Sequence, residues 1–271
     1  MTLKKKKMTS AEVKKKTKSA LQLILIIAIG MSYLFFGGQI KKWTTAYKQI
    51  RSEKTTTVST EYDDGKIDGI SEYRNTPYEV LNDNEPEFTD SEKNNTKEYY
   101  KYSELDDYGR CGTAMACIGE ENLQTEERGD ISNIKPSGWQ SIEADDVDGG
   151  WLYNRSHLIA NCLGGPCGRD GENEDDLKKN LITGTRYMNV EGMEKFELMI
   201  RDYISETKNH VIYRVTPLYK NNDLLAGGVK MEAYSVEDDG DGITFNVFCY
   251  NVQPGYKINY ATGDCKRLEE K

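Results

Sequence analysis

The fold assignment depends on the stretch Tyr153-Asn154-Arg155-Ser156-His157-Leu158-Ile159 and on Asn180 and Asn189, which follow it. His157 is one of only two histidines in the 271 residues, and it lies two positions after an arginine. The other histidine, His210, is expected at a helix-to-strand junction without a chemical role. Side chains suited to chemistry are therefore concentrated around one segment of the sequence.

Each residue type in this segment suits one part of a hydrolytic site. Histidine titrates near neutral pH and can accept a proton from water. Arg155 is a permanent cation whose planar guanidinium matches a phosphate. Asn189 offers a neutral oxygen to a hard cation such as Mg²⁺, although a lone asparagine more often caps a helix or forms a turn. In combination, the three residues suit the attack of water on a phosphodiester.

These segments together resemble the DNA/RNA non-specific endonucleases, in particular the Gram-positive branch with nucleases of DNA uptake and secreted streptococcal DNases. The family motif is Asp-Arg-Gly-His, then an asparagine about twenty residues later, a second asparagine and a glutamate. The matching positions here are Asn154-Arg155-Ser156-His157, Asn180, Asn189 and Glu197. The resemblance runs from about Tyr78 to Asp264.

Two positions depart from the family motif. Asn154 replaces an acid and keeps only its hydrogen-bonding capacity. Ser156 replaces a glycine, which could have adopted a positive φ or allowed a close backbone approach. These substitutions put the geometry of the loop in question more than the activity.

The resemblance implies an α/β domain whose mostly antiparallel central sheet carries a ββα-metal motif. His157 would be the general base at the end of a strand or loop, with Arg155 beside it in the catalytic site. Asn189, near the start of a helix, would bind Mg²⁺ or alternatively Mn²⁺. The substrate would be DNA and also RNA, with 5′-phosphate products.

Other residues have supporting roles under this hypothesis. Asn180 and Asn154 would hold the loop and orient the groups around the metal. Glu197 would act through water or orient another group, but the sequence alone favours an exposed helix charge. The predicted nucleic-acid contacts are Arg186, Arg110, Lys178 and Lys179, with Arg110 as a candidate transition-state arginine.

The N-terminus predicts a membrane anchor. Residues 1–19 are basic, and residues 20–38 are mostly apolar and long enough to span a bilayer. The basic end would be cytoplasmic and the rest outside the cell; cleavage as a signal peptide and secretion is the alternative. Residues 39–75 are expected to be a polar tether and residues 76–271 the endonuclease domain.

Charge divides the chain at the same place. Residues 1–42 carry a net charge of +9. Because the net charge of the whole chain is −9, residues 43–271 carry −18. An acidic domain lacks a broad electrostatic attraction for nucleic acid, which argues against the nuclease hypothesis. A metal ion and local cations would have to supply the positive field.

The six cysteines suit an oxidising exterior, and their even number permits complete pairing. Cys162 and Cys167 flank a tight turn and are the best local candidates for a disulfide. Cys111 and Cys117 could pair only if the chain turned between them. Free buried cysteines remain an alternative, and a zinc site is disfavoured because no Cys-x-x-Cys spacing occurs.

Several regular elements are expected from residue patterns. Apolar spacing predicts a helix over 190–206 with a core face of Met193, Phe196, Ile200, Tyr203 and Ile204. Strands are predicted over 109–118, 151–153, 211–215, 228–234 and 243–248, and residues 77–84 are expected to form a strand and a turn.

Two other function classes fit parts of the sequence. A catalytically inactive surface DNA receptor could use the same fold, and a membrane-anchored adhesion protein would explain an anchor joined to an acidic domain. The complete His157/Asn189 pair favours the enzyme over both.

Overall fold

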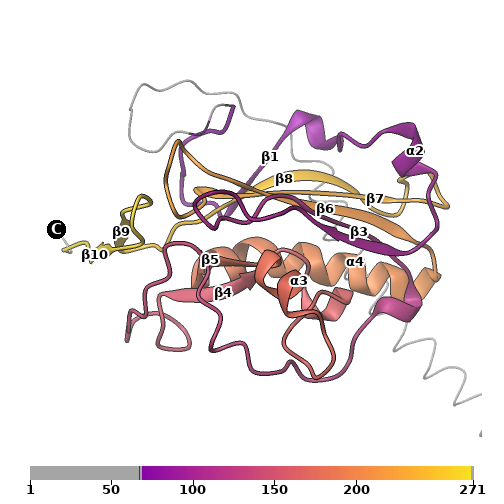
Figure 1. The fold of residues 1–271 in the computed structure, drawn as a ribbon. Helices are drawn as coiled ribbons and strands as arrows, with labels where there is room; N and C mark the ends of the chain where they lie inside the picture. The colour runs from indigo at the N-terminus through magenta and orange to yellow at the C-terminus, as the bar shows by residue number, and fades with distance from the viewer. Residues whose placement is uncertain (1–66, 68, 270–271) are drawn as a thin grey trace, which may run out of the picture. The chain divides into compact units, whose positions relative to one another are not determined.

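A six-stranded antiparallel sheet forms the centre of the fold in the computed structural model, which describes residue 67 and residues 69–269. The strand order is β1-β8-β7-β6-β3-β2 (Figure 1). The strands are β1 (Tyr78–Val80), β2 (Tyr99–Tyr102), β3 (Ala114–Ile118), β6 (Val211–Leu218), β7 (Gly228–Ser235) and β8 (Thr244–Tyr250). The predicted α/β fold with a mostly antiparallel central sheet is confirmed.

Two antiparallel ribbons and three helices surround this sheet in the described part of the chain. The ribbons pair β4 (Tyr153–His157) with β5 (Leu181–Thr185), and β9 (Tyr256–Ile258) with β10 (Cys265–Arg267). The helices are α2 (Asp90–Lys93), α3 (Glu174–Lys179) and α4 (Glu194–Thr207), and a π-helical turn, Met188–Met193, runs directly into α4. In Figure 1, α4 and the β4–β5 ribbon lie on one side of the sheet and α2 on the other.

The core lies between the sheet and α4. Side chains alternate along β6, so Tyr213 and Val215 point to the α4 side while Arg214 points away. Phe196 of α4 packs on Phe245 of β8 with ring centroids 5.0 Å apart. The predicted core face of the helix is confirmed, because its five apolar residues are all buried.

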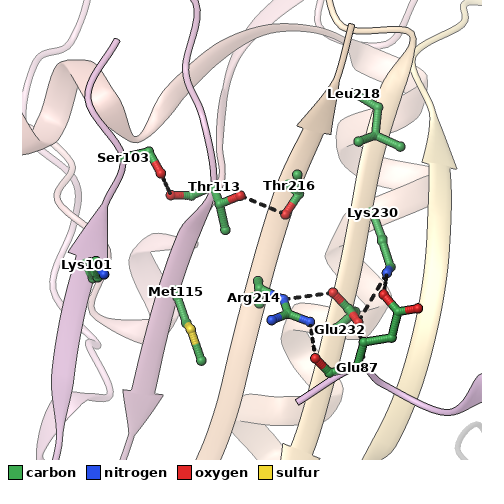
Figure 2. A pocket seen from close by; sticks show the side chains of 10 residues that line it. All are labelled: Glu87, Lys101, Ser103, Thr113, Met115, Arg214, Thr216, Leu218, Lys230 and Glu232. Carbon is green, nitrogen blue, oxygen red and sulfur yellow. Dashed lines mark hydrogen bonds and ion pairs between the residues drawn. The ribbon is translucent and has the colours of Figure 1, made fainter. Parts of the chain in front are cut away.

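The opposite face of the sheet is polar and carries a pocket of about 610 Å³ (Figure 2). Its charged groups mostly neutralise one another. Arg214 pairs with Glu232, and Lys230 pairs with both Glu232 and Glu87. None of the predicted site residues lines this pocket.

The strand predicted over 109–118 is shorter than expected, since β3 begins only at Ala114. Asp106 provides the physical reason. Its carboxylate accepts hydrogen bonds from the backbone N–H groups of Tyr108 and Arg110 and forms an ion pair with the Arg110 guanidinium. The chain therefore turns before the strand starts.

The predicted strand and turn over 77–84 are confirmed by β1 and the turn that follows it. The end of the predicted tether, in contrast, packs on the domain. Ile70 is buried against Phe248 and Tyr250, and the Tyr73 ring contacts Tyr187. Residues 69–75 therefore belong to the folded unit.

No helix within residue 67 and residues 69–269 combines the length and the apolar character needed to cross a membrane. The predicted basic segment 1–19, the anchor 20–38 and most of the tether lie outside the described residues.

All six cysteines are free thiols, so the predicted disulfides, including Cys162 with Cys167, are wrong. The thiols have other partners. Cys167 Sγ donates to Asn161 Oδ1, and Cys111 Sγ donates to the carbonyl oxygen of Leu181. Four of the six cysteines are buried and pack as small apolar side chains, which is the alternative considered above.

Candidate active site

The β4–β5 ribbon positions the histidine motif. His157 is the last residue of β4 and lies opposite Leu181, while Asn154 lies opposite Gly184. Alternation along the strand projects Arg155 and His157 from one face and Ser156 from the other. The prediction that His157 ends a strand is confirmed.

Ser156, which occupies the glycine position of the family motif, is accommodated by a glycine on the neighbouring strand. Its side chain is fully buried over Gly184, where an added Cβ would lie 2.2 Å from Ser156 Oγ. Ser156 does not have a positive φ. The backbone therefore requires no glycine at position 156, and the close approach falls at Gly184.

A pocket of about 440 Å³ lies beside this ribbon. It brings together five predicted site residues: Asn154, Arg155, His157, Arg186 and Asn189. The rest of its lining comes from Arg128, Gly129, Asp130, Ile131, Ser132, Trp139, Ser141, Trp151 and Tyr153. The sequence motif and the pocket therefore coincide.

The His157 imidazole is enclosed at the base of this site. Its Nε2 atom is buried and has no hydrogen-bond partner among the described residues. Burial, followed by the Arg128 cation, lowers the pKa of His157 to about 4. The ring is therefore neutral at pH 7, and in the tautomer protonated at Nδ1 its Nε2 can accept a proton.

Asn189 reaches the pocket because it lies in the π-helical turn before α4. The wider π turn changes the phase of Asn189 relative to α4, so Asn189 lines the pocket while Met193 and Phe196 face the core. Its side-chain amide has no hydrogen bond within the described part of the chain. The predicted place near a helix start is confirmed.

Asn180 is fully buried and uses its whole side chain to hold the loop after His157. Its Oδ1 accepts from the Ile159 N–H at 2.8 Å, and its Nδ2 donates to the carbonyl oxygens of Ile159 and Pro166. Both donors of this amide and one lone pair of its oxygen are therefore used within the protein. These contacts fit the predicted supporting role.

Arg155 lines the pocket but is already engaged with protein. Its Nε and Nη2 donate to the carbonyl oxygens of Ile134 and Ser132, and its guanidinium stacks over the Trp139 ring at 4.0 Å. Arg155 thus fixes the loop that forms the pocket wall. Asn154 also lines the pocket.

Glu197 does not line the pocket, and its interpretation as an exposed helix charge is wrong. Part of the residue remains accessible, but its carboxyl group is enclosed near Cys162, Tyr213 and Cys249. Burial, followed by the charge of Glu194, raises the pKa of Glu197 to about 8. The carboxyl group is therefore largely protonated at neutral pH.

The predicted nucleic-acid contacts separate into two groups. Arg186 lines the pocket, where its Nη2 pairs with Asp148 at 2.7 Å. Arg110 instead bonds to Asp106 and to backbone carbonyls, and it does not line the pocket. Lys178 and Lys179 lie on α3, where acidic side chains pair with both of them. Neither lysine lines the pocket, and their charges pair within α3 and with the loop before β3, so their contact with nucleic acid stays a prediction.

Several residues of the pocket were missed from the sequence. Arg128 is exposed and acts on His157 electrostatically, and Trp139 and Trp151 form part of the lining. The only available signal was the single arginine in the acidic run Glu126-Glu127-Arg128-Gly129-Asp130. No spacing rule connects that loop to β4.

His210 lies between α4 and β6, as expected. Its Nδ1 is 2.6 Å from a carboxylate oxygen of Glu237, and its Nε2 is 3.9 Å from one of Glu98. These contacts give it a structural role.

The geometry of this site agrees with the comparison to known proteins. Residues 90–237 match the model of the DNA/RNA non-specific endonucleases. The chain belongs to this family. As a member, it is an endonuclease, a hydrolase of nucleic-acid phosphodiesters, and the resemblance stated above is confirmed.

Two solved structures resemble this endonuclease. NucA from Streptococcus agalactiae, solved with a magnesium ion bound, is 30% identical with a TM-score of 0.61; the match covers 70% of this chain and 87% of NucA. The Sda1 nuclease, solved with a zinc ion bound, is 27% identical with a TM-score of 0.59; the match covers 72% of this chain and 97% of Sda1.

The donor atoms in the endonuclease pocket suit a hard, well-hydrated cation. No group of three or more His, Cys, Asp or Glu side chains converges among the described residues. The Asn189 amide oxygen is instead a neutral oxygen donor without a partner in the part of the chain that the structure describes. Mg²⁺ keeps several waters and accepts few protein ligands, so these residues fit it.

Proposed function

We propose that this endonuclease hydrolyses DNA, and also RNA, without sequence specificity in a Mg²⁺-dependent reaction, with Mn²⁺ as an alternative ion. One observation carries the proposal. The Nε2 of a neutral His157 and the amide of Asn189, neither of which has a hydrogen-bond partner among the described residues, line the same pocket. A proton acceptor and a metal ligand are the two groups that the reaction needs most.

In the proposed reaction His157 Nε2 takes a proton from water, and the oxygen attacks phosphorus in line with the departing 3′-oxygen. The products therefore carry 5′-phosphates. Arg128 provides a cation for the phosphate, and Arg155 keeps the pocket wall in position through Ser132 and Ile134. When bound by Asn189, Mg²⁺ supplies positive charge for the phosphate oxygens. Glu197 lies outside the pocket lining and has no step in this reaction.

A plasmid-nicking assay with the purified full-length chain tests this function. Supercoiled DNA and a labelled RNA are incubated with Mg²⁺, with Mn²⁺ and with EDTA. We expect His157→Ala to reduce cleavage by roughly 10²- to 10⁴-fold, the contribution of a general base. His210→Ala is the matched control and should retain activity. A His157→Ala variant that keeps half of the wild-type rate would remove His157 from the mechanism.

We also propose that residues 20–38 anchor the enzyme in the cell membrane with the endonuclease domain outside. The apolar length and the preceding lysines support this topology. The test is fractionation of cells that express a C-terminally tagged chain, followed by protease treatment of intact cells. A tag in the medium, at a size lacking the first 40 or so residues, would indicate a cleaved signal peptide and a secreted enzyme.

The alternative function is that of an inactive surface protein that binds DNA or serves in adhesion. An anchor joined to an acidic domain suits adhesion, whereas the charge of −18 on residues 43–271 opposes DNA binding. The nicking assay separates the two hypotheses, because an inactive receptor would retain DNA without metal-dependent nicking.

A further inference from the structure

Trp151 is an exposed aromatic side chain in the wall of the active-site pocket. It remains 47% exposed, and no ring, cation–π or hydrogen-bond contact of its indole is found among the described residues. Trp139, in the same pocket, is covered by the Arg155 guanidinium. Trp151 therefore presents an apolar surface that no ring or cation of the described residues covers.

The backbone holds Trp151 firmly despite this exposure. Trp151 forms an isolated β-bridge with Glu143, and the next residue, Leu152, donates its N–H to the Ile142 carbonyl. Gly149 and Gly150, both with positive φ, form the turn that leads into it. Because the backbone at Trp151 is already ordered, stacking of the ring needs no ordering of the loop.

The distance between Trp151 and His157 sets the size of the ligand. Six residues of extended chain separate them, which is at most about 20 Å. Successive nucleotides of a stacked strand are about 3.4 Å apart. A base that stacks on Trp151 therefore lies within about six nucleotides of a phosphate at His157.

Electrostatic attraction in this pocket is limited. Arg155 is engaged by backbone carbonyls and Arg186 by Asp148, which leaves Arg128 as the pocket arginine without such a partner among the described residues. Residues 43–271 also carry −18. Stacking of a base on an aromatic ring needs no positive charge and tolerates every base.

We infer that Trp151 forms a nucleobase-stacking subsite, which holds a base within about six nucleotides of the cleaved phosphodiester. This inference rests on the proposed function and names the part of a nucleic acid that the pocket rim recognises. The subsite binds substrate and transition state equally, so its loss raises KM and leaves kcat nearly unchanged.

The test compares the full-length wild type with Trp151→Ala, Trp151→Phe and, as a matched exposed aromatic outside the pocket, Tyr108→Ala. The substrates are a single-stranded oligonucleotide of about 12 nucleotides and an abasic oligonucleotide of the same length. We expect Trp151→Ala to raise KM roughly 5- to 150-fold on the ordinary oligonucleotide, the range that base stacking provides. The abasic oligonucleotide should not distinguish the variants. Trp151→Phe keeps an aromatic ring that can stack, so its KM should stay near the wild-type value. Tyr108→Ala should have the same KM as the wild type.

Binding of a labelled oligonucleotide in EDTA provides a second measurement that does not depend on cleavage. Trp151→Ala should weaken this binding without changing its dependence on salt, because stacking releases no counterions. Equal KM values on the ordinary oligonucleotide, equal losses on the abasic and ordinary oligonucleotides, or unchanged binding would overturn the subsite. If Trp151→Ala weakens binding but no nucleic acid is cleaved, the subsite stands and the proposed function fails.

Discussion

At the scale of single residues, the two asparagines of the motif differ in what their side chains contact. Asn180 uses its amide on Ile159 and Pro166, whereas the Asn189 amide has no bond to a described residue. The same residue type therefore serves the loop at one position and is available to a metal at the other.

This difference predicts separate effects of two substitutions. Asn189→Ala should raise the Mg²⁺ concentration needed for half-maximal cleavage and leave the melting temperature unchanged. Asn180→Ala should destabilise the fold by about 1–3 kcal/mol, because it leaves buried backbone groups unpaired. Mg²⁺ titration of the cleavage rate and thermal unfolding measure the two effects. A larger shift of the Mg²⁺ midpoint for Asn180→Ala would contradict the ligand assignment.

Glu197 predicts a pH dependence of stability. Its pKa is about 8 in the folded state against an ordinary value of 4.5. Between these values the folded chain keeps a proton that the unfolded chain has lost, so the contribution of Glu197 to stability falls as pH rises. Glu197→Gln has no titrating carboxyl group at this position, so the variant lacks this fall in stability with rising pH. The melting temperature of the variant minus that of the wild type, measured in EDTA, should be greater at pH 8 than at pH 5.

The control for this prediction is Glu121→Gln, which removes an exposed carboxylate that does not contribute to the raised pKa of Glu197. It should show a much smaller change between the two pH values. A difference for Glu197→Gln that is constant with pH would mean that its carboxyl group titrates normally.

At the scale of elements, the β4–β5 ribbon depends on the contact between Ser156 and Gly184. A Cβ at Gly184 would lie 2.2 Å from Ser156 Oγ and 2.6 Å from the Met188 methyl carbon. The Met188 methyl is the end of a flexible side chain, whereas Ser156 is fixed by the strand. Ser156 is therefore the main obstacle to a larger residue at position 184.

We predict that Gly184→Ala destabilises the fold by about 1–3 kcal/mol, the usual cost of overpacking. Adding Ser156→Gly should recover much of this loss, since it removes the clashing atoms. Denaturant unfolding of both single variants and the double variant gives the coupling energy. Strictly additive losses would show that the two side chains do not compete for the same space.

The π-helical turn before α4 is a second element that determines the geometry of the site. A regular helix over 190–206 accounts for the buried face of Phe196 and Ile200, but it would give Asn189 the wrong phase. The extra residue in the turn allows one continuous helical segment to serve both the core and the pocket.

At the scale of the whole molecule, the cysteines predict insensitivity to reduction. All six are free, and the described fold relies on the core between the sheet and α4. A reducing agent should therefore leave the melting temperature unchanged, and alkylation after denaturation without reduction should modify all six thiols. A lower melting temperature in reductant, together with fewer modified thiols, would indicate a disulfide.

The sequence by itself determined the elements that local patterns encode. The helical spacing of Met193, Phe196 and Ile200 identified the helix, and the alternation of apolar residues identified β6, β7 and β8. The spacing from His157 to Asn189 identified the family and the centre of the site, because these residues lie on a contiguous ββα unit. Such features depend on neighbours close in sequence, which a single sequence displays.

Only the tertiary structure decided the surroundings of that centre. Arg128, Trp139 and Trp151 reach the pocket through loops that no periodicity describes. The enclosure of the Glu197 carboxyl group depends on Cys162 and on strands distant in sequence, and the thiols stay apart because their partners lie on separate elements. Burial and pairing are set by contacts between distant segments, so they follow from the packing of the elements and not from their local sequence.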